Sequence, residues 1–112
     1  MYTCQKADEY IEKNRVDRAD KPEFHLTTPV GWLNDPNGFS IYGGKAHLFY
    51  QFHPYSTEWG PMHWGHSTSD DFIRWEELPT ALAPDSDYDA YSSFSGTTIE
   101  NDGKHVLFYT GV

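Results

Sequence analysis

Residues 39–52, FSIYGGKAHLFYQF, read as two β-strands joined by a tight turn. Gly43 and Gly44 separate two runs of strand-forming residues, and a glycine pair favours a two-residue hairpin turn because glycine adopts positive φ without a steric penalty. A second hairpin is predicted within residues 95–112, SGTTIENDGKHVLFYTGV, where the turn at 101–103 is slightly longer. The sequence therefore predicts an antiparallel all-β protein from this region onward.

The two hairpins resemble each other. GKAHLFY at 44–50 aligns with GKHVLFY at 103–109, with five of seven positions identical and an offset of 59 residues. Two further strands are predicted between them, at 63–70 and 73–82, and four strands per repeat are typical of β-propeller blades. Chance recurrence of short strand motifs is the alternative explanation of the match.

One whole repeat and about half of a second fit into the 112 residues. A repeat unit cannot bury its apolar faces alone, so we expect this chain to be the N-terminal part of a longer protein. A complete small β domain is the alternative. Residues 3–15 predict a short helix, because Cys4, Ala7 and Ile11 share one helical face. We therefore divide the chain into a helix and connector at 1–23 and a truncated propeller domain at 24–112.

Composition narrows the possible partners. The formal net charge is −9, which disfavours nucleic acid and anionic membrane surfaces as partners because both require a basic face. The chain carries four Trp, eight Tyr and seven Phe, and aromatic rings form platforms for the apolar faces of sugars. The single cysteine cannot form an internal disulfide, and no apolar run has the length of a signal peptide. We expect a cytoplasmic protein, and the sequence does not indicate its oligomeric state.

Asp35 lies in the stretch GWLNDPNG, residues 31–38. Pro36 biases Asp35 towards an extended backbone, and the Pro-Asn-Gly sequence that follows predicts a tight turn. The repeat offset makes residue 35 equivalent to residue 94, so Asp35 and the Phe94-Ser95 pair are expected at neighbouring strand starts, at one end of the propeller channel. Such a funnel is a common place for a ligand pocket. From local sequence alone, NDPNG could also be an ordinary turn.

These motifs resemble glycoside hydrolase family 32, which contains the invertases, fructanases and sucrose-6-phosphate hydrolases. The resemblance starts at GWLNDPNG, continues through residues 47–85, HLFYQFHPYSTEWGPMHWGHSTSDDFIRWEELPTALAPD, and ends with FSGTTIENDGKHVLFYTGV. It implies a five-bladed β-propeller followed by a β-sandwich, of which this chain holds the first blade and part of the second. It also implies retaining cleavage of terminal β-fructofuranosyl bonds, with no cofactor and a small sugar as the partner.

The resemblance assigns roles by position. Asp35 matches the nucleophile that forms a fructosyl-enzyme intermediate. The matched substrate-binding positions are Asn34, Gln51, Trp59, Phe94 and Ser95. Retaining glycosidases need a second carboxyl group, and the Glu-Cys and Arg-Asp-Pro motifs of the family do not occur in these residues. A non-catalytic sugar-binding fragment, a fructan hydrolase and a fructosyltransferase therefore remain alternatives to a sucrose or sucrose 6-phosphate hydrolase.

Two patterns could suggest metal ions. His63 and His66 are three residues apart, a spacing that puts them on opposite faces of a strand, so we expect structural hydrogen bonds and no metal. Asp85, Asp87 and Asp89 imitate the start of a calcium loop, but the Gly and Glu that an EF-hand requires are missing. We predict a solvated acidic loop.

Overall fold

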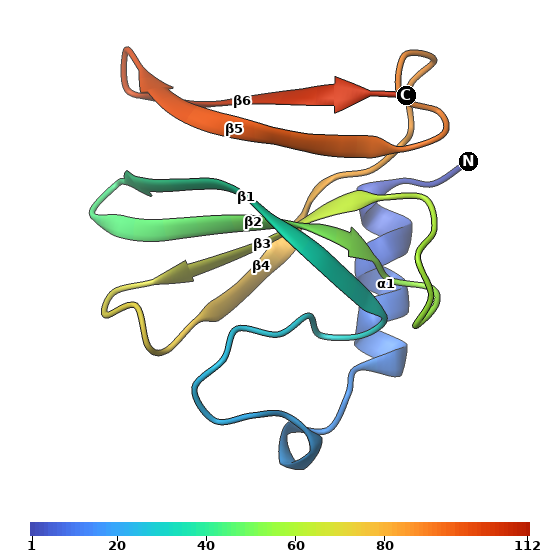
Figure 1. The fold of residues 1–112 in the computed structure, drawn as a ribbon, viewed down its shortest axis with the longest axis horizontal. Helices are drawn as coiled ribbons and strands as arrows, with labels where there is room; N and C mark the ends of the chain where they lie inside the picture. The colour runs from blue at the N-terminus through green and yellow to red at the C-terminus, as the bar shows by residue number, and fades with distance from the viewer.

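The computed structural model describes all 112 residues and is almost entirely β-structure. In chain order its elements are α1 (Cys4–Asn14), the 3₁₀ helix η1 (Arg18–Asp20), β1 (Trp32–Tyr42), β2 (Lys45–His53), β3 (His63–Ser69), β4 (Glu76–Leu82), β5 (Ser93–Asn101) and β6 (Lys104–Gly111). The first four strands form one antiparallel sheet in the order β1-β2-β3-β4, and β5 and β6 form a separate hairpin. Figure 1 shows the hairpin lying over the four-stranded sheet.

Both predicted hairpins are confirmed. Gly43 and Gly44 form the β1–β2 turn with φ of 58° and 76°, and Gly103 closes the β5–β6 turn at φ 72°. The fourth strand begins later than predicted, at Glu76. The reason is local, because the side chain of Asp71 accepts hydrogen bonds from the backbone N–H groups of residues 73 and 74 and keeps them in a turn.

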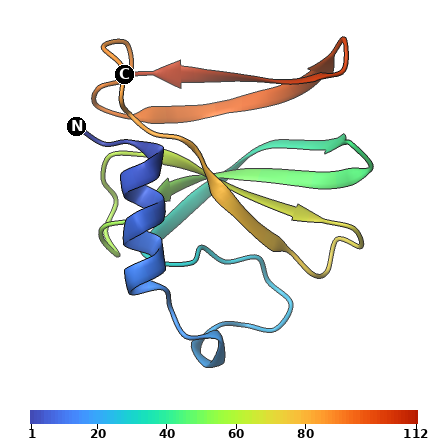
Figure 2. The same ribbon diagram turned by 180° about the vertical axis from the view of Figure 1, so that it is seen from behind.

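The N-terminal helix is also confirmed. Thr3 caps α1, because its hydroxyl accepts a hydrogen bond from the Lys6 N–H at 3.2 Å. Ala7 and Ile11 form the buried face of the helix. The connector after it contains η1. Figure 2 shows α1 beside the four-stranded sheet, and no helix has the length and apolar character needed to cross a bilayer.

The two sheets pack through β1 and β5, which are direct neighbours. Thr98 on β5 donates a hydrogen bond to the carbonyl oxygen of Gly38 on β1 at 2.8 Å, and the Trp64 indole donates to the carbonyl oxygen of Phe94 at 3.0 Å. The four-stranded sheet is the first blade of a β-propeller and the β5–β6 hairpin is half of the next. This arrangement brings the starts of β1 and β5 together.

Candidate active site

One pocket of about 380 Å³ opens between the two sheets. Its lining consists of Asn34, Asp35, Gln51, Trp59, Phe94, Ser95 and Thr110. All six residues predicted from the sequence therefore line the same pocket, although they come from β1, β2, β5 and the loop between β2 and β3. Asp35 is the only charged residue among them.

A β-bulge presents Asp35 to this pocket. Leu33 pairs with Phe52 and Pro36 pairs with Tyr50, so two residues of β1, Asn34 and Asp35, lie where the register shifts. A bulge leaves its extra residue unpaired and re-aims the side chain. The predicted tight turn at Pro36-Asn37-Gly38 is wrong, because β1 continues through these residues and shifts register again beyond Asn37.

Gly38 supplies the backbone freedom that this irregular strand needs. Its φ is 52°, a conformation that glycine adopts without strain. A Cβ at this position would lie 2.4 Å from the Thr98 methyl group. Asn37, just before it, is buried, and its side-chain oxygen accepts a hydrogen bond from the Gly96 N–H at 3.4 Å. The strand that carries Asp35 is thereby fixed to the second sheet.

Polar contacts orient the groups around Asp35. The Ser95 hydroxyl donates to Oδ2 of Asp35 at 3.3 Å. The Trp32 indole donates to the side-chain oxygen of Asn34 at 2.8 Å. Gln51 is 2% exposed, and its Nε2 donates to the carbonyl oxygen of Ser93 at 3.1 Å. These hydrogen bonds fix the side chains at the pocket, and such preorganisation lowers the entropic cost of binding a ligand.

Two aromatic rings form an apolar wall of the pocket. Trp59 is 48% exposed and meets Phe94 edge to face, with ring centroids 6.3 Å apart. Thr110 also lines the pocket and was not predicted from the sequence. The repeat offset carried a signal for it, because Thr110 lies 59 positions after Gln51, and it pairs with Phe94 across the β5–β6 hairpin.

The predicted solvated loop at Asp85, Asp87 and Asp89 needs a correction. Asp85 and Asp87 are exposed, but Asp89 is 1% exposed. Its carboxylate accepts hydrogen bonds from the Ser86 N–H, the Ser93 hydroxyl and the Tyr109 hydroxyl. Donors from a distant strand, which local sequence does not reveal, compensate the burial of this carboxylate.

Three histidines from different strands meet between the sheets, a cluster that the sequence did not reveal. Nδ1 of His47 lies 2.9 Å from Nε2 of His66, and Nε2 of His105 lies 2.9 Å from the Ser40 hydroxyl. The rings of His47 and His105 are 4.9 Å apart. Burial, and secondarily the neighbouring His47 and His105, lowers the pKa of His66 to about 4. His63 lies on the opposite face of β3, as predicted, and burial lowers its pKa to about 4.

These rings do not form a metal centre. No group of three or more His, Cys, Asp or Glu side chains is arranged to hold an ion.

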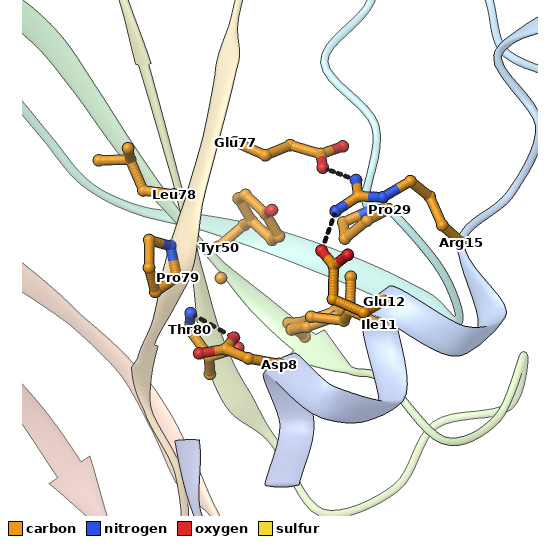
Figure 3. A pocket seen from close by; sticks show the side chains of 12 residues that line it. Asp8, Ile11, Glu12, Arg15, Pro29, Tyr50, Glu77, Leu78, Pro79 and Thr80 are labelled. Atoms are coloured by element: carbon orange, nitrogen blue, oxygen red, sulfur yellow. Dashed lines mark hydrogen bonds and ion pairs between the residues drawn. The ribbon is translucent and has the colours of Figure 1, made fainter. Parts of the chain in front are cut away.

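A second cavity, of about 230 Å³, lies between α1 and β4 (Figure 3). Its charged side chains are engaged with protein groups. Asp8 accepts a hydrogen bond from the Thr80 N–H at 2.9 Å, and the Arg15 guanidinium pairs with Glu12 and Glu77. The cavity shares no lining residue with the Asp35 pocket. These contacts attach the helix to the sheet.

Comparison with known proteins gives one consistent result. The family description "Glycosyl hydrolases family 32 N-terminal domain" matches residues 25–112. The chain is 51% identical to a sucrose-6-phosphate hydrolase of Zymomonas mobilis over 90 residues, 80% of this chain and 18% of that protein. It is 46% identical to a levanase of Bacillus subtilis over 111 residues, 99% of this chain and 16% of that protein.

A solved structure is similar over nearly the whole chain. The GH32 β-fructofuranosidase BmSUC1 of Bombyx mori superimposes with a TM-score of 0.86 at 49% identity, covering 96% of this chain and 23% of that enzyme. The chain thus spans about a fifth of the length of the proteins that it resembles.

Proposed function

The chain belongs to glycosyl hydrolase family 32, and on this basis we propose that it supplies the nucleophile of a retaining β-fructofuranosidase acting on sucrose or sucrose 6-phosphate. One observation carries the proposal. The only carboxylate of the pocket, Asp35, is surrounded there by the five other residues that sequence motifs predicted. Their positions along the chain range from 34 to 95, so local sequence does not bring them together.

The proposed chemistry is double displacement. A carboxylate oxygen of Asp35 attacks the anomeric carbon of the fructosyl unit, and the bond from that carbon to the glycosidic oxygen breaks. A general acid protonates the departing oxygen, and water later hydrolyses the fructosyl ester. Retaining enzymes place the two carboxyl groups about 5–5.5 Å apart. The pocket lining contains no second carboxylate, so the acid is proposed to come from outside these 112 residues.

The other pocket residues have binding roles in this proposal. Asn34 and Gln51 form hydrogen bonds with fructose hydroxyls, and the rings of Trp59 and Phe94 cover its apolar face. Ser95 orients the nucleophile through its bond to Oδ2. No lysine or arginine lines the pocket, so a phosphate on the substrate would have to be bound elsewhere in the protein.

The experiment is Asp35→Asn in the full-length protein that contains this chain, assayed with sucrose. Loss of the nucleophile should lower kcat by several orders of magnitude and leave the circular dichroism spectrum unchanged. Asp102→Asn is the matched control, because Asp102 lies in the β5–β6 turn outside the pocket. Asp102 has a φ of 50°, and asparagine tolerates this left-handed conformation as well as aspartate does. Hydrolysis near the wild-type rate in Asp35→Asn would disprove the assignment of the nucleophile.

The alternatives have their own tests. Fructosyl transfer would use the same residues, and analysis of the products at high sucrose concentration separates it from hydrolysis. The 112-residue chain alone should not turn over sucrose, because its pocket has no general acid; turnover would overturn this expectation. We also propose a cytoplasmic location, because Cys4 is free and the chain does not depend on disulfides.

A further inference from the structure

Asp89 is a buried carboxylate close to the pocket that the proposed chemistry does not use. It lies in the connector between β4 and β5 and is 1% exposed, whereas Asp87, two residues earlier, is exposed. Removing an anion from water is strongly unfavourable unless hydrogen bonds or opposite charges compensate it. No lysine, arginine or histidine forms an ion pair with Asp89, so the compensation comes from hydrogen bonds.

Three donors fill this role. The Ser86 N–H donates to Oδ1 at 2.9 Å, and the hydroxyls of Ser93 and Tyr109 donate to Oδ2 at 3.3 and 2.7 Å. Burial, together with the hydrogen bond to Asp89, raises the pKa of the Tyr109 hydroxyl, which therefore remains a donor. One carboxylate thus connects the start of β5 with the end of β6.

Both strand residues held by Asp89 are direct neighbours of pocket residues. Ser93 precedes Phe94, and Tyr109 precedes Thr110. The carbonyl oxygen of Ser93 also accepts the hydrogen bond from Gln51 Nε2. A short chain of contacts therefore runs from the Asp89 carboxylate through Ser93 to the Gln51 side chain.

We propose that Asp89 is a positioning residue of the sugar pocket: it fixes Ser93 and Tyr109 and, through the Ser93 carbonyl, orients the Gln51 amide towards a fructose hydroxyl. The inference rests on the proposed function. Asp89 does not line the pocket, so its effect on the substrate passes through other residues.

The test compares Asp89→Asn with Asp87→Asn in the full-length enzyme with sucrose. Asparagine keeps the shape of the side chain but replaces the charged acceptor with a neutral amide, so the Ser93 and Tyr109 hydroxyls lose their bonds to a carboxylate and must turn to accept from the amide N–H groups. Small displacements of positioned groups reduce rates by up to about 100-fold. We expect kcat/KM to fall about 10-fold or more, mainly through a higher KM, because Gln51 binds the ground-state sugar. Asp87→Asn should match the wild type.

A double-mutant cycle separates positioning from a general structural role. If Asp89 acts through Gln51, Asp89→Asn should have a much smaller effect in the Gln51→Ala background than in the wild type. Equal effects in both backgrounds, or an unchanged kcat/KM, would overturn the inference. Tyr109→Phe removes the hydroxyl that donates to Asp89 and keeps the ring next to Trp64. It can replace Asp89→Asn in the same cycle if that variant does not fold.

The outcomes also distinguish this inference from the proposed function. An active wild type, an inactive Asp35→Asn variant and an unaffected Asp89→Asn variant would remove the inference and keep the function. A wild-type enzyme without β-fructofuranosidase activity would remove both.

Discussion

The Ser95 hydroxyl donates a hydrogen bond to Oδ2 of Asp35 across 3.3 Å, although the two residues are 60 positions apart and belong to different sheets. A neighbouring bond, from the Gly96 N–H to the side chain of Asn37, runs between the same two strands. The proposed nucleophile is therefore held partly by its own bulged strand and partly by the next blade. The position of Asp35 in the first blade therefore depends on residues of the second.

Ser95→Ala should reduce activity without unfolding the protein. The variant removes one donor to a carboxylate, and hydrogen bonds to charged groups contribute about 1.5–3 kcal/mol. The bond is long and the site is exposed, so we expect the low end of this range, about a tenfold fall in kcat/KM with sucrose. Ser95→Thr keeps a hydroxyl group and should retain more activity. Equal losses in the two variants would show that the hydroxyl is not the important group.

Much of the fold could be predicted because its signals are local. The glycine turn at 43–44 and the repeated GK–LFY pattern define both hairpins without long-range information. The grouping of the pocket residues followed from the family resemblance, and the offset of 59 residues independently aligned Asp35 with the Phe94 segment. In a repeat protein, residues at equivalent positions of successive repeats lie next to each other in space, so the offset places residues 35 and 94 close together.

The failures involve residues whose partners are distant in sequence. NDPNG has the composition of a turn, but pairing with β2 keeps it in a strand and converts the irregularity into a bulge. Asp89 looks like a residue of a solvated acidic loop until Tyr109, 20 positions later, is placed beside it. His47 and His66 meet across β2 and β3 without a regular spacing in sequence, and His105 joins them only when the second sheet packs on the first.

Gly38→Ala should destabilise the protein more than Gly43→Ala. Both residues have positive φ, 52° and 58°, where a Cβ costs about 1–2 kcal/mol. A Cβ on Gly43 meets no atom within 4 Å, whereas one on Gly38 would lie 2.4 Å from Thr98. The difference in the free energy of unfolding between the two variants, measured in urea, isolates this steric term. Gly38→Ala should also lower kcat by displacing the strand that carries Asp35. Equal stability of the two variants would show that a Cβ at residue 38 is not crowded by Thr98.

Ile11→Ala should loosen the N-terminal helix. Ile11 forms a buried cluster with Tyr50 and Phe52, and truncation of a buried isoleucine to alanine typically costs about 2–5 kcal/mol. Hydrogen exchange should show loss of protection in α1, with the greatest loss near residue 11. Val16→Ala is the control, because Val16 is 39% exposed and its truncation should leave exchange in α1 unchanged. Protection of α1 equal to the wild type in Ile11→Ala would mean that this contact does not hold the helix.

Acidification should destabilise the folded protein through His66. Burial lowers its pKa from 6.5 to about 4, so the folded state favours the neutral ring and the unfolded state binds the proton more readily. The contribution of His66 to stability is therefore complete above pH 6.5 and is lost progressively as the pH falls towards about 4. The ring stacks on Phe49 with centroids 4.0 Å apart and forms a hydrogen bond with His47, so protonation also adds positive charge beside a second imidazole.

In the full-length protein, the urea concentration at the midpoint of unfolding should decrease as the pH is lowered from 6.5 to about 4. His66→Gln should reduce this pH dependence, because glutamine does not titrate. An unchanged pH dependence in His66→Gln would assign the acid sensitivity to another group, with the fully buried His63 as the next variant to measure.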